Sequence, residues 1–339
     1  MSGVETRYVG KNETDQRLDK WFKHHFPALP FGRLQKLLRT GQIRVDGKRA
    51  KTNTRIESGQ SIRIPPLDAA DSSSDSQNRK PASNPKDRAF IRSLVIYSDK
   101  NVIAIDKPAG LAVQGGTNTE RHIDGMLDHL TDYDDLSTGE RPRLVHRLDK
   151  DTSGVMVLAR TLKAAQKLSD AFRKKDSRKI YWAVTVGVPK PAEGEIDMPL
   201  AKGGGAGQER VFGDREEGKS AITWFKVLDH AAHKAAVVAL WPRTGRTHQL
   251  RAHMEIIGTP ILGDGKYGGQ EAFLGGEGIA KQVHLHAREL VLPGMDGKKT
   301  GPRILAAVPE HMMQTFEVLG IDPLIHGDID PFVDFVAPS

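Results

Sequence analysis

One segment of the chain, residues 144–160, joins a cluster of charged side chains to an apolar run rich in β-branched residues. Within it, Asp149 lies between Arg147 and Lys150, and Gly154 allows a sharp turn. Nearby positive charge favours the ionised form of a carboxyl group, so we expect Asp149 to be charged at neutral pH. Such an aspartate can act as a nucleophile, a general base or a metal ligand. A structural aspartate that pairs with arginine in a turn is the alternative that this segment alone leaves open.

Two further segments carry side chains that could share a site with Asp149. Residues 179–184 alternate as a strand does and include Tyr181, whereas residues 242–253 are rich in arginine and histidine and include Arg251. Considered singly, Tyr181 is typical of a core or surface aromatic side chain, and Arg251 of a solvated helix charge. The histidine pairs 248/253 and 284/286 could suggest a metal. Without cysteine, and without an acidic partner at ligand spacing, they are more typical of structural histidines.

The elements that must position these segments are mostly strands, with a few helices between them. Alternation and short apolar runs predict strands, and a 3.6-residue period predicts helices, the one after Thr161 being capped by its hydroxyl. The expected strands cover residues 93–97, 102–105, 180–186, 222–228 and 235–240, the last two as a hairpin. The expected helices cover residues 123–130, 162–175, 247–257 and 310–319. This order favours an α+β fold with a mixed, mainly antiparallel sheet over residues 90–320.

Residues 14–66 form a separate small module in this interpretation. Thr14 or Asp15 could cap a first helix, and a second helix from about residue 30 to 39 ends before Gly41, as helices often do. Short strands follow. The first 66 residues hold 14 Lys and Arg against 6 Asp and Glu, whereas the whole chain has a net charge of +7. A basic end of this kind is expected of a nucleic-acid partner, although a solubilising face is the alternative.

The remaining composition limits the class of protein. Residues 67–89 lack apolar periodicity and are predicted to be a flexible linker, and residues 321–339 a poorly ordered tail. No apolar run approaches the roughly 20 residues that span a bilayer, and residues 1–17 lack the apolar core of a signal peptide. The chain has no cysteine, which suits a reducing cytoplasm. These features predict a cytoplasmic protein that does not enter the membrane.

Two familiar motifs match in letters but not in context. Residues 213–220 read Gly-Asp-Arg-Glu-Glu-Gly-Lys-Ser and fit the phosphate-binding pattern of nucleotide hydrolases. That loop needs a strand before it and a helix after it. Here a glycine-rich loop precedes and a strand-like run follows, so we do not expect a nucleotide site. Gly263, Gly265 and Gly268 fit a dinucleotide pattern but are better explained as turns.

The N-terminal module resembles the S4 RNA-binding domain. The resemblance rests on Arg-Leu-Asp-Lys-Trp from residue 17, Leu-Gln-Lys-Leu-Leu-Arg from residue 34, and Gly-Gln-Ile-Arg-Val-Asp-Gly-Lys from residue 41. It covers most of residues 14–66. It implies RNA contacts on the second helix and the strand after it, through Arg33, Lys36, Arg39 and Arg44.

Residues 94–310 resemble the RluA family of pseudouridine synthases. The strings His146–Gly154, Lys179–Val184 and Pro242–His253 occur in the family's order. Further matching strings are Asp106–Gly110, Gly258–Asp264 and Leu285–Ala287. The N-terminal module and residues 113–116 are most similar to the branch that acts on large-subunit ribosomal RNA, although Gln114 stands where that branch more often has histidine.

The resemblance implies a role for each matched residue. Asp149 corresponds to the catalytic aspartate, which attacks the ribose or promotes loss of uracil from C1′, so that the base can rejoin through C5. Tyr181 corresponds to the tyrosine that packs on the uracil, and Arg251 to the basic residue that pairs with the catalytic carboxylate. Arg147 corresponds to the arginine that fills the RNA stack after a base leaves it. His146, Arg246 and His248 are further expected RNA contacts.

The family's reaction has no redox step and no nucleotide hydrolysis, so the resemblance implies no cofactor, no metal and no nucleotide. The expected partner is large-subunit ribosomal RNA, and nothing in the sequence requires more than a monomer. Two other classes stay open as hypotheses. The chain could be an RNA chaperone or ribosome-assembly factor with a vestigial pocket, or a nucleotide hydrolase that uses Lys219.

Overall fold

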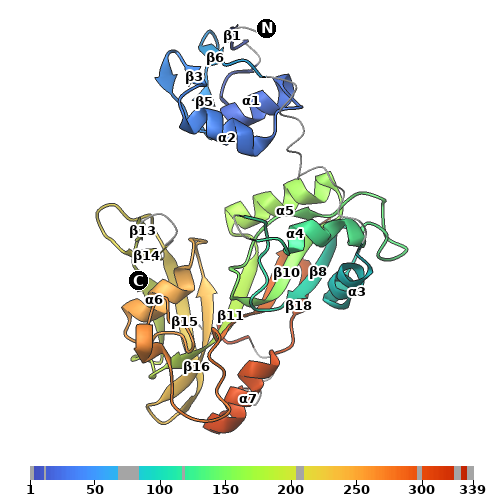
Figure 1. Ribbon diagram of the computed structural model, residues 1–339. Coiled ribbons are helices and arrows are strands. Elements are labelled where there is room, and N and C mark those ends of the chain that lie inside the picture. Colours follow the sequence, from blue (N-terminus) through green and yellow to red (C-terminus); the bar gives the residue numbers. More distant parts are fainter. Residues whose placement is uncertain are drawn as a thin grey trace. The chain divides into compact units, whose positions relative to one another are not determined.

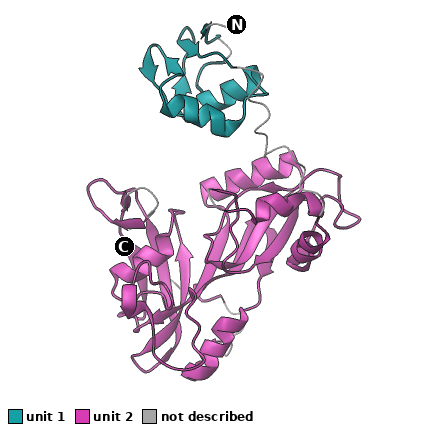
Figure 2. Cartoon of the chain, viewed as in Figure 1, with its two compact units in different colours: residues 1–82 teal, residues 83–339 magenta. Residues whose placement is uncertain are grey.

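The chain folds into two compact units, residues 1–82 (unit 1) and residues 83–339 (unit 2), shown in Figure 2. The computed structural model describes residues 4–10, 13–67, 84–116, 119–203, 210–295, 300–323 and 330–333. Each unit has its own hydrophobic core, and each is described here by itself.

Unit 1 contains two short helices and six short strands. Its sheet has the order β1–β6–β3–β4, and β2 pairs separately with β5. The strands are β1 (Glu5–Tyr8), β2 (Gln16–Arg17), β3 (Arg44–Val45), β4 (Lys48–Arg49), β5 (Arg55–Ile56) and β6 (Ser61–Ile64). The helices are α1 (Leu18–His25) and α2 (Phe31–Arg39). Leu34, Leu37 and Leu38 bury one face of α2 against Trp21 and Phe22 of α1, as the helical period predicts.

The predicted side-chain cap of the first helix is wrong. Helix α1 begins at Leu18, and its N-cap residue is Arg17, without a side-chain cap bond. Asp15 instead has a positive φ of 61°, and its backbone N–H donates to the carbonyl of Ile56. The chain is drawn into strand pairing just before the helix, and a local sequence pattern does not reveal that pairing.

The predicted cationic side chains of unit 1 lie on its surface. Lys36 and Arg39 on α2 are exposed, and Arg33 on the same helix is partly exposed. Arg44 on β3 is exposed, and its guanidinium donates to the carbonyls of Gly41 and Gly47 at 3.1 Å each. The last of these contacts fixes Arg44 beside the turn between β3 and β4.

Unit 2 is built on one ten-stranded sheet. Its main order is β12–β15–β16–β11–β17–β10–β8–β7, with β18 beside β17 and β9 beside β10. Neighbouring strands are antiparallel except β10 and β17, which are parallel. The strands are β7 (Val95–Ser98), β8 (Val102–Lys107), β9 (Arg143–Leu144), β10 (Ser153–Ala159), β11 (Arg178–Val186), β12 (Glu193–Asp197), β15 (Ile222–Ala231), β16 (Ala235–Pro242), β17 (Leu285–Pro293) and β18 (Thr300–Leu305). The α+β class with a mixed, mainly antiparallel sheet is confirmed.

Helices cover the two halves of this sheet separately (Figure 1). α6 (Gln249–Ile256) packs near β16, whereas α5 (Leu162–Lys174) packs on β10. The other helices are α3 (Pro85–Ser93), α4 (Ile123–Met126), α7 (Glu310–Leu319) and the 3₁₀ turns η3 (Leu127–Leu130) and η4 (Gly269–Ala272). A two-stranded ribbon, β13 (Leu200–Gly203) with β14 (Arg210–Gly213), lies beside α6. Every residue of β10 is buried, which explains its continuous apolar run.

Several predicted elements are confirmed in their bounds or caps. The hairpin of β15 and β16 forms as expected, and α7 spans the predicted residues. The hydroxyl of Thr161 accepts the N–H of Ala164 at 3.1 Å and caps α5. These elements are long and strongly periodic, so their local pattern and their tertiary packing agree.

Two predicted boundaries are wrong. Helix α3 begins at Pro85, capped by the Asn84 side chain, so the expected linker over 67–89 ends before it; its residues 68–83 lie outside the described part. The expected tail, 321–339, contains Phe332, which is 5% exposed and packs in the core around Trp241. Arg178 forms an ion pair with Asp330 beside it. A short segment carries too little periodicity to reveal such docking, and residues 324–329 and 334–339 are not described.

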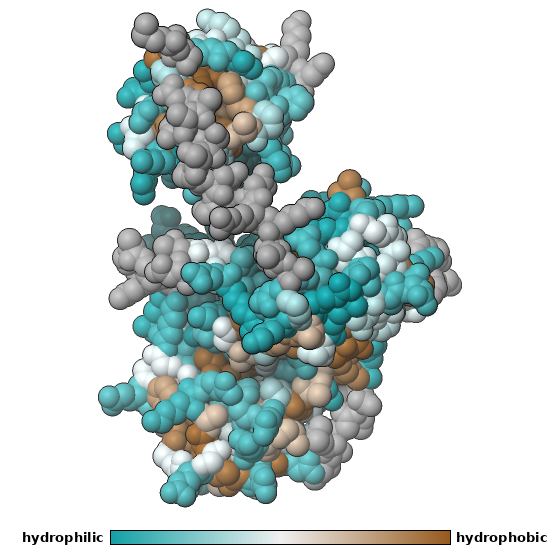
Figure 3. Space-filling model, turned by 45° about the vertical axis from the view of Figure 1, so that its right-hand side comes forward, coloured by the Kyte–Doolittle hydropathy of each residue, from teal (hydrophilic) through white to brown (hydrophobic). Residues whose placement is uncertain are grey.

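The visible surface is mostly hydrophilic, with scattered hydrophobic patches, as Figure 3 shows. Among the described residues, no helix is both long and apolar enough to cross a membrane.

Candidate active site

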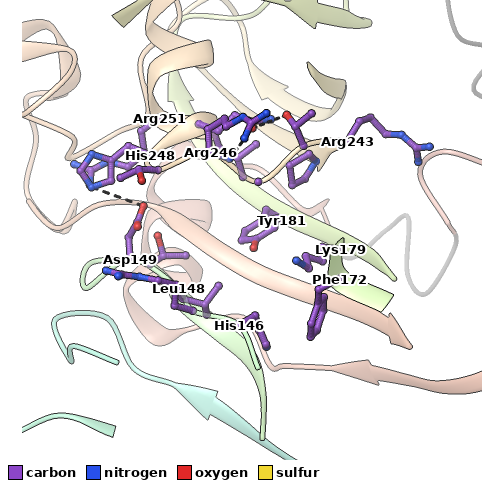
Figure 4. A pocket seen from close by; sticks show the side chains of 18 of the residues that line it. His146, Leu148, Asp149, Phe172, Lys179, Tyr181, Arg243, Arg246, His248 and Arg251 are labelled. Carbon is purple, nitrogen blue, oxygen red and sulfur yellow. Dashed lines mark hydrogen bonds and ion pairs between the residues drawn. The ribbon is translucent and has the colours of Figure 1, made fainter. Parts of the chain in front are cut away.

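The three segments singled out in the sequence meet around one cavity of about 770 Å³ in unit 2, here called the central cavity (Figure 4). Its wall comes from the loop between β9 and β10, the end of α5, strand β11, and the loop between β16 and α6. Asp149, Tyr181, Arg251, Arg147, His146, Arg246 and His248 all line it. The tertiary structure therefore brings together every residue predicted for the catalytic unit.

The loop before β10 places Asp149 in the central cavity. Its side chain is 24% exposed, and its carbonyl accepts the N–H of Thr152 at 3.2 Å. Gly154 begins the buried strand with a φ of +108°, and a Cβ there would lie 2.3 Å from the carbonyl oxygen of Ala287. Only glycine fits that close approach of β10 to β17. The position of the loop is therefore set by the strand that follows it.

The buried side chain of Lys107 supports the loop that carries Asp149. The ammonium of Lys107 donates to the carbonyls of Pro108, Leu111 and Lys150 at 2.8, 2.9 and 3.0 Å, and the residue is 0% exposed. Burial lowers its pKa to about 8, against the charges of Asp151 and Asp149. Lys107 ties the loop of Asp149 to the end of β8. The sequence shows Lys107 only as part of the string Asp106–Gly110.

Tyr181 lies on β11 and points into the central cavity (Figure 4). The pairing of β11 with β17 shifts register between Ile180 and Tyr181, but the extra residue lies on β17, so β11 keeps the regular alternation of its side chains. Burial, and then the charge of Asp149, raises the pKa of the Tyr181 phenol. The hydroxyl therefore stays protonated at neutral pH and can donate a hydrogen bond.

A buried glutamine holds the loop between β16 and α6. The Gln249 side-chain oxygen accepts from the Thr244 hydroxyl at 2.7 Å and from the Arg246 N–H at 3.1 Å. Its amide group donates to Ile222 and Thr223 on β15 at 2.9 Å each. Arg246 is exposed at the cavity rim, where its guanidinium donates to the Ser220 carbonyl. The rim that carries the cations is thus fixed to the sheet.

His248 lies nearest to Asp149 among the predicted contacts. Its Nε2 is 3.9 Å from Asp149 Oδ2, and its Nδ1 is 3.0 Å from the Tyr267 hydroxyl. That hydroxyl also accepts the N–H of Val211, so its own proton is available for Nδ1. Burial lowers the pKa of His248, although the Asp149 charge opposes this shift. A neutral His248 with its proton on Nε2 would direct that proton toward Asp149.

The expected direct pair between Arg251 and Asp149 is wrong for this structure. Arg251 instead forms two bonds to Asp264, 2.6 Å from Nε and 2.7 Å from Nη2, and Asp264 is 0% exposed. Burial opposes the charge on Arg251, but the bonds and charge of Asp264 outweigh it and raise the Arg251 pKa, with a further contribution from Asp149. The charge of Arg251 therefore interacts with the charge of Asp149 without a direct hydrogen bond, and Asp264 fixes the position of Arg251. Asp264 was part of a quoted motif, but spacing did not reveal its pairing.

Arg147 and His146, which lie two and three residues before Asp149, differ in their surroundings. Arg147 is exposed at the cavity wall. His146 is partly buried, and its Nε2 accepts the N–H of Val157 at 2.9 Å. Burial, with a smaller effect of the Lys179 charge, lowers the pKa of His146 to about 3. His146 is therefore neutral and packs on Phe172, with ring centroids 4.7 Å apart, rather than serving as a charged RNA contact.

The segments that matched other motifs have ordinary structural surroundings. Residues 213–220 run from the end of β14 to just before β15, so a strand follows where a phosphate-binding loop needs a helix. A short strand, rather than only a loop, precedes them. Among the described residues, no group of three or more acidic or histidine side chains could hold a metal. His253 and His284 contact Thr223 and Thr315 in the core.

The central cavity is strongly cationic. Among the lining residues that the structure describes, Asp149 is the one carboxylate. The cations that line it are Arg147, Arg173, Lys175, Lys179, Lys202, Arg243, Arg246 and Arg251. Arg243 contacts both Trp224 and Trp241, with its guanidinium carbon 4.5 and 4.4 Å from their ring centroids. A cavity of this charge suits a polyanion, with a single acid placed for chemistry.

Comparison with known proteins agrees with this site. A model of the family described as RNA pseudouridylate synthase matches residues 101–256. A Rickettsia conorii protein named ribosomal large subunit pseudouridine synthase C is 37% identical over 287 residues, covering 81% of this chain and 88% of that protein. A Salmonella typhi protein of the same name is 32% identical and covers 92% and 95%. The solved structure of human RNA pseudouridylate synthase domain containing 4 matches with a TM-score of 0.59, at 30% identity, over 70% of this chain and 98% of that one.

The fold, the cavity and these relatives define an enzyme that isomerises uridine in RNA. The chain belongs to the RluA family of pseudouridine synthases.

Proposed function

We propose that this enzyme converts specific uridines of large-subunit ribosomal RNA to pseudouridine, with Asp149 as its catalytic residue. The observation that carries the assignment is Asp149 itself, the one carboxylate among the described residues that line a cavity of cations, with Tyr181 in the same cavity. The names of the relatives support the choice of RNA, since the Rickettsia and Salmonella proteins are named for the large ribosomal subunit.

In the proposed reaction the N1–C1′ bond breaks, the uracil rotates and a C5–C1′ bond forms. The hydrogen on C5 leaves as a proton, and N1 carries a proton in the product. Asp149 either attacks C1′ or promotes the departure of uracil from it. Arg251, fixed by Asp264, supplies positive charge near Asp149, and the Nε2 of His248 lies 3.9 Å from Asp149 Oδ2.

In this proposal Tyr181 and Arg147 act on the uridine that leaves the RNA stack: Tyr181 contacts its uracil, and Arg147 fills the gap that it leaves. Taking an internal uridine out of the RNA stack costs a few kcal/mol and needs both a pocket and a filler. The partly buried ring of Tyr181 offers a face for the uracil, and its protonated hydroxyl can take part in proton transfer. Arg147 is exposed beside Asp149, where a planar guanidinium can stack in the gap that the base leaves.

Unit 1 is proposed to act as an S4-like RNA-binding domain. Exposed Lys36 and Arg39, with Arg33 and Arg44, would contact phosphates. Residues 67–83 would tether it to the catalytic domain. We further propose that the enzyme works in the cytoplasm as a monomer. It needs no metal or nucleotide cofactor in this proposal, because Asp149 and its cationic surroundings are sufficient for the bond changes above.

Pseudouridine mapping tests this proposal. Ribosomal RNA from cells that lack the protein is compared with RNA from cells that carry it, and we expect particular large-subunit sites to lose pseudouridine. Resupply of the wild-type chain restores them. If every large-subunit site is retained while sites in transfer RNA disappear, the substrate assignment is wrong. If the purified chain binds ribosomal RNA but releases no tritium from C5-labelled uridine, a binding role replaces the catalytic one.

A further inference from the structure

Lys179 lines the central cavity, and the reaction described above gives it no task. It lies on β11 two residues before Tyr181. Figure 4 shows its side chain beside Tyr181 and above Phe172, on the side of Tyr181 away from Asp149. A cation at this place borders the position proposed for the uracil without reaching the catalytic carboxylate.

The partly exposed ammonium of Lys179 differs from the buried cations of unit 2. Lys107 donates to three carbonyls, Arg251 binds Asp264 with two bonds, and Arg160 pairs with Asp134. Lys179 lies 4.4 Å from the centroid of the Phe172 ring, and among the described residues this ring is its partner. Partial burial lowers the pKa of Lys179 to about 8. An ammonium that contacts a ring in a cavity lacks the protein hydrogen-bond acceptors that such groups normally find.

The surroundings of Lys179 are arranged to receive an anion. Phe172 packs on the neutral ring of His146 and also contacts Lys179. Arg173, Lys175 and Ser177 line the same cavity, in which Asp149 is the one carboxylate among the described lining residues. An anion placed there would favour the charged form of Lys179 and so reverse the effect of burial.

We propose that Lys179, seated on Phe172, binds one phosphate group of the RNA strand next to the uridine that enters the central cavity. This inference rests on the proposed function, because it names the part of the RNA that occupies this end of the cavity. A phosphate fits better than a uracil carbonyl, since a desolvated charge is fully compensated only by an opposite charge. Lysine binds phosphate as a point charge and needs no planar partner. The contact would fix the backbone while the base rotates.

Binding and rate measurements on the full chain test the proposal. We expect Lys179→Met to weaken binding of a large-subunit ribosomal RNA transcript about tenfold at low salt. The slope of log Kd against log salt should fall by about 0.7 to 0.9, the value for one lost phosphate contact. Because the reacting atoms are untouched, kcat should change less than about threefold, within the scatter of a binding-only effect. Lys179→Arg should restore most of the affinity and the slope.

Lys175→Met is the matched control, because Lys175 is an exposed cation at the same end of the cavity. It should have a smaller effect on affinity. A second test uses synthetic RNA with the mapped uridine and a single uncharged methylphosphonate linkage, placed in turn at each neighbouring position. At one position the neutral linkage should weaken wild-type binding but leave Lys179→Met unaffected.

Three results would overturn the phosphate contact. One is an unchanged affinity and salt slope in Lys179→Met with an intact melting temperature. Another is a fall in kcat alone, which would indicate contact with the uracil. A third is an equal loss in Lys179→Arg and Lys179→Met with a lowered melting temperature, which would indicate a purely structural lysine. If the wild-type chain forms no pseudouridine in this RNA, the proposed function fails, whereas the salt slopes still report the phosphate contact separately.

Discussion

The cations of unit 1 and those around the central cavity of unit 2 are held in different ways. On α2 of unit 1, Lys36 and Arg39 project into solvent. In unit 2, Arg251 is 4% exposed and Lys107 is 0% exposed, and each is fixed by hydrogen bonds to buried acceptors. The sequence shows both sets simply as Lys and Arg. In our proposal the exposed charges attract RNA, whereas the buried charges define the geometry around Asp149.

The difference follows from the cost of burial. A buried charge is stable only when its partners satisfy it, so its position is determined by the fold. An exposed charge keeps its solvation and rotamer freedom, so it adds affinity without fixing a geometry. Substitutions of Asp149 and of the cations fixed by buried acceptors should therefore affect rate or stability, whereas substitutions of Lys179 and of the exposed cations of unit 1 should affect affinity and its salt dependence.

Asp149→Asn should have the largest effect. The amide keeps the shape but cannot attack C1′ or carry the negative charge, so kcat should fall by about 10³-fold or more. Tritium release from C5-labelled RNA measures it, with RNA affinity staying within about threefold, as expected when only the reacting group changes. Substantial turnover by a correctly folded Asp149→Asn protein would remove Asp149 from the chemistry.

Lys107→Met should lower the free energy of unfolding more directly than it lowers the reaction rate. It leaves three buried carbonyls without their donor, and the free energy of unfolding of unit 2 should fall by about 2–4 kcal/mol. The folded pKa of Lys107, about 8, lies below its ordinary value of 10.5, so its contribution to stability is present above pH 10.5 and is lost as the pH falls through 8. Denaturant unfolding of both proteins from pH 7 to 10.5 should show a difference that grows with pH. A constant difference would contradict the buried charge.

Arg147→Met should have an intermediate effect on catalysis. Methionine fills space but cannot stack as a plane or contact phosphate, so kcat/KM should fall by about 10- to 100-fold. The comparison is with RNA in which the mapped uridine faces a mismatch or lies in an open loop, where less unstacking is needed. The defect should shrink on that RNA. An equal defect on both RNAs would argue against a role in base extraction.

The triple substitution of Arg33, Lys36 and Arg39 by Gln should have the smallest effect on turnover. With three phosphate contacts removed, the salt slope should fall by about 2 to 3 and Kd should rise, while kcat at saturating RNA stays within about twofold. Filter binding at several salt concentrations measures both. A matched control replaces Arg55, which lies on β5 and pairs with Asp15. A large loss of kcat in the triple variant would show that unit 1 also shapes the active site.

Much of the fold of unit 2 could be predicted because its elements are long and periodic. Helix α7 and the hairpin of β15 and β16 carry patterns that only one structure satisfies. Helix α3 and the docking of Phe332 were missed, because a polar helix after a linker and a single apolar residue near the end give no periodic signal. Lys179 could have been noticed from its spacing of two from Tyr181 on a strand, which places both on one face.

By itself, the sequence determined the fold class and the family, and it predicted Asp149, Tyr181 and Arg251 as site residues, because the strings around them are long and specific. Only the tertiary structure decided how they are paired. Arg251 binds Asp264, His248 lies beside Asp149, and Lys179 lines the cavity in contact with the Phe172 ring. Pairing depends on the distances between segments that the sheet brings together, and on which buried charges find a partner once water is excluded. A linear pattern contains neither quantity.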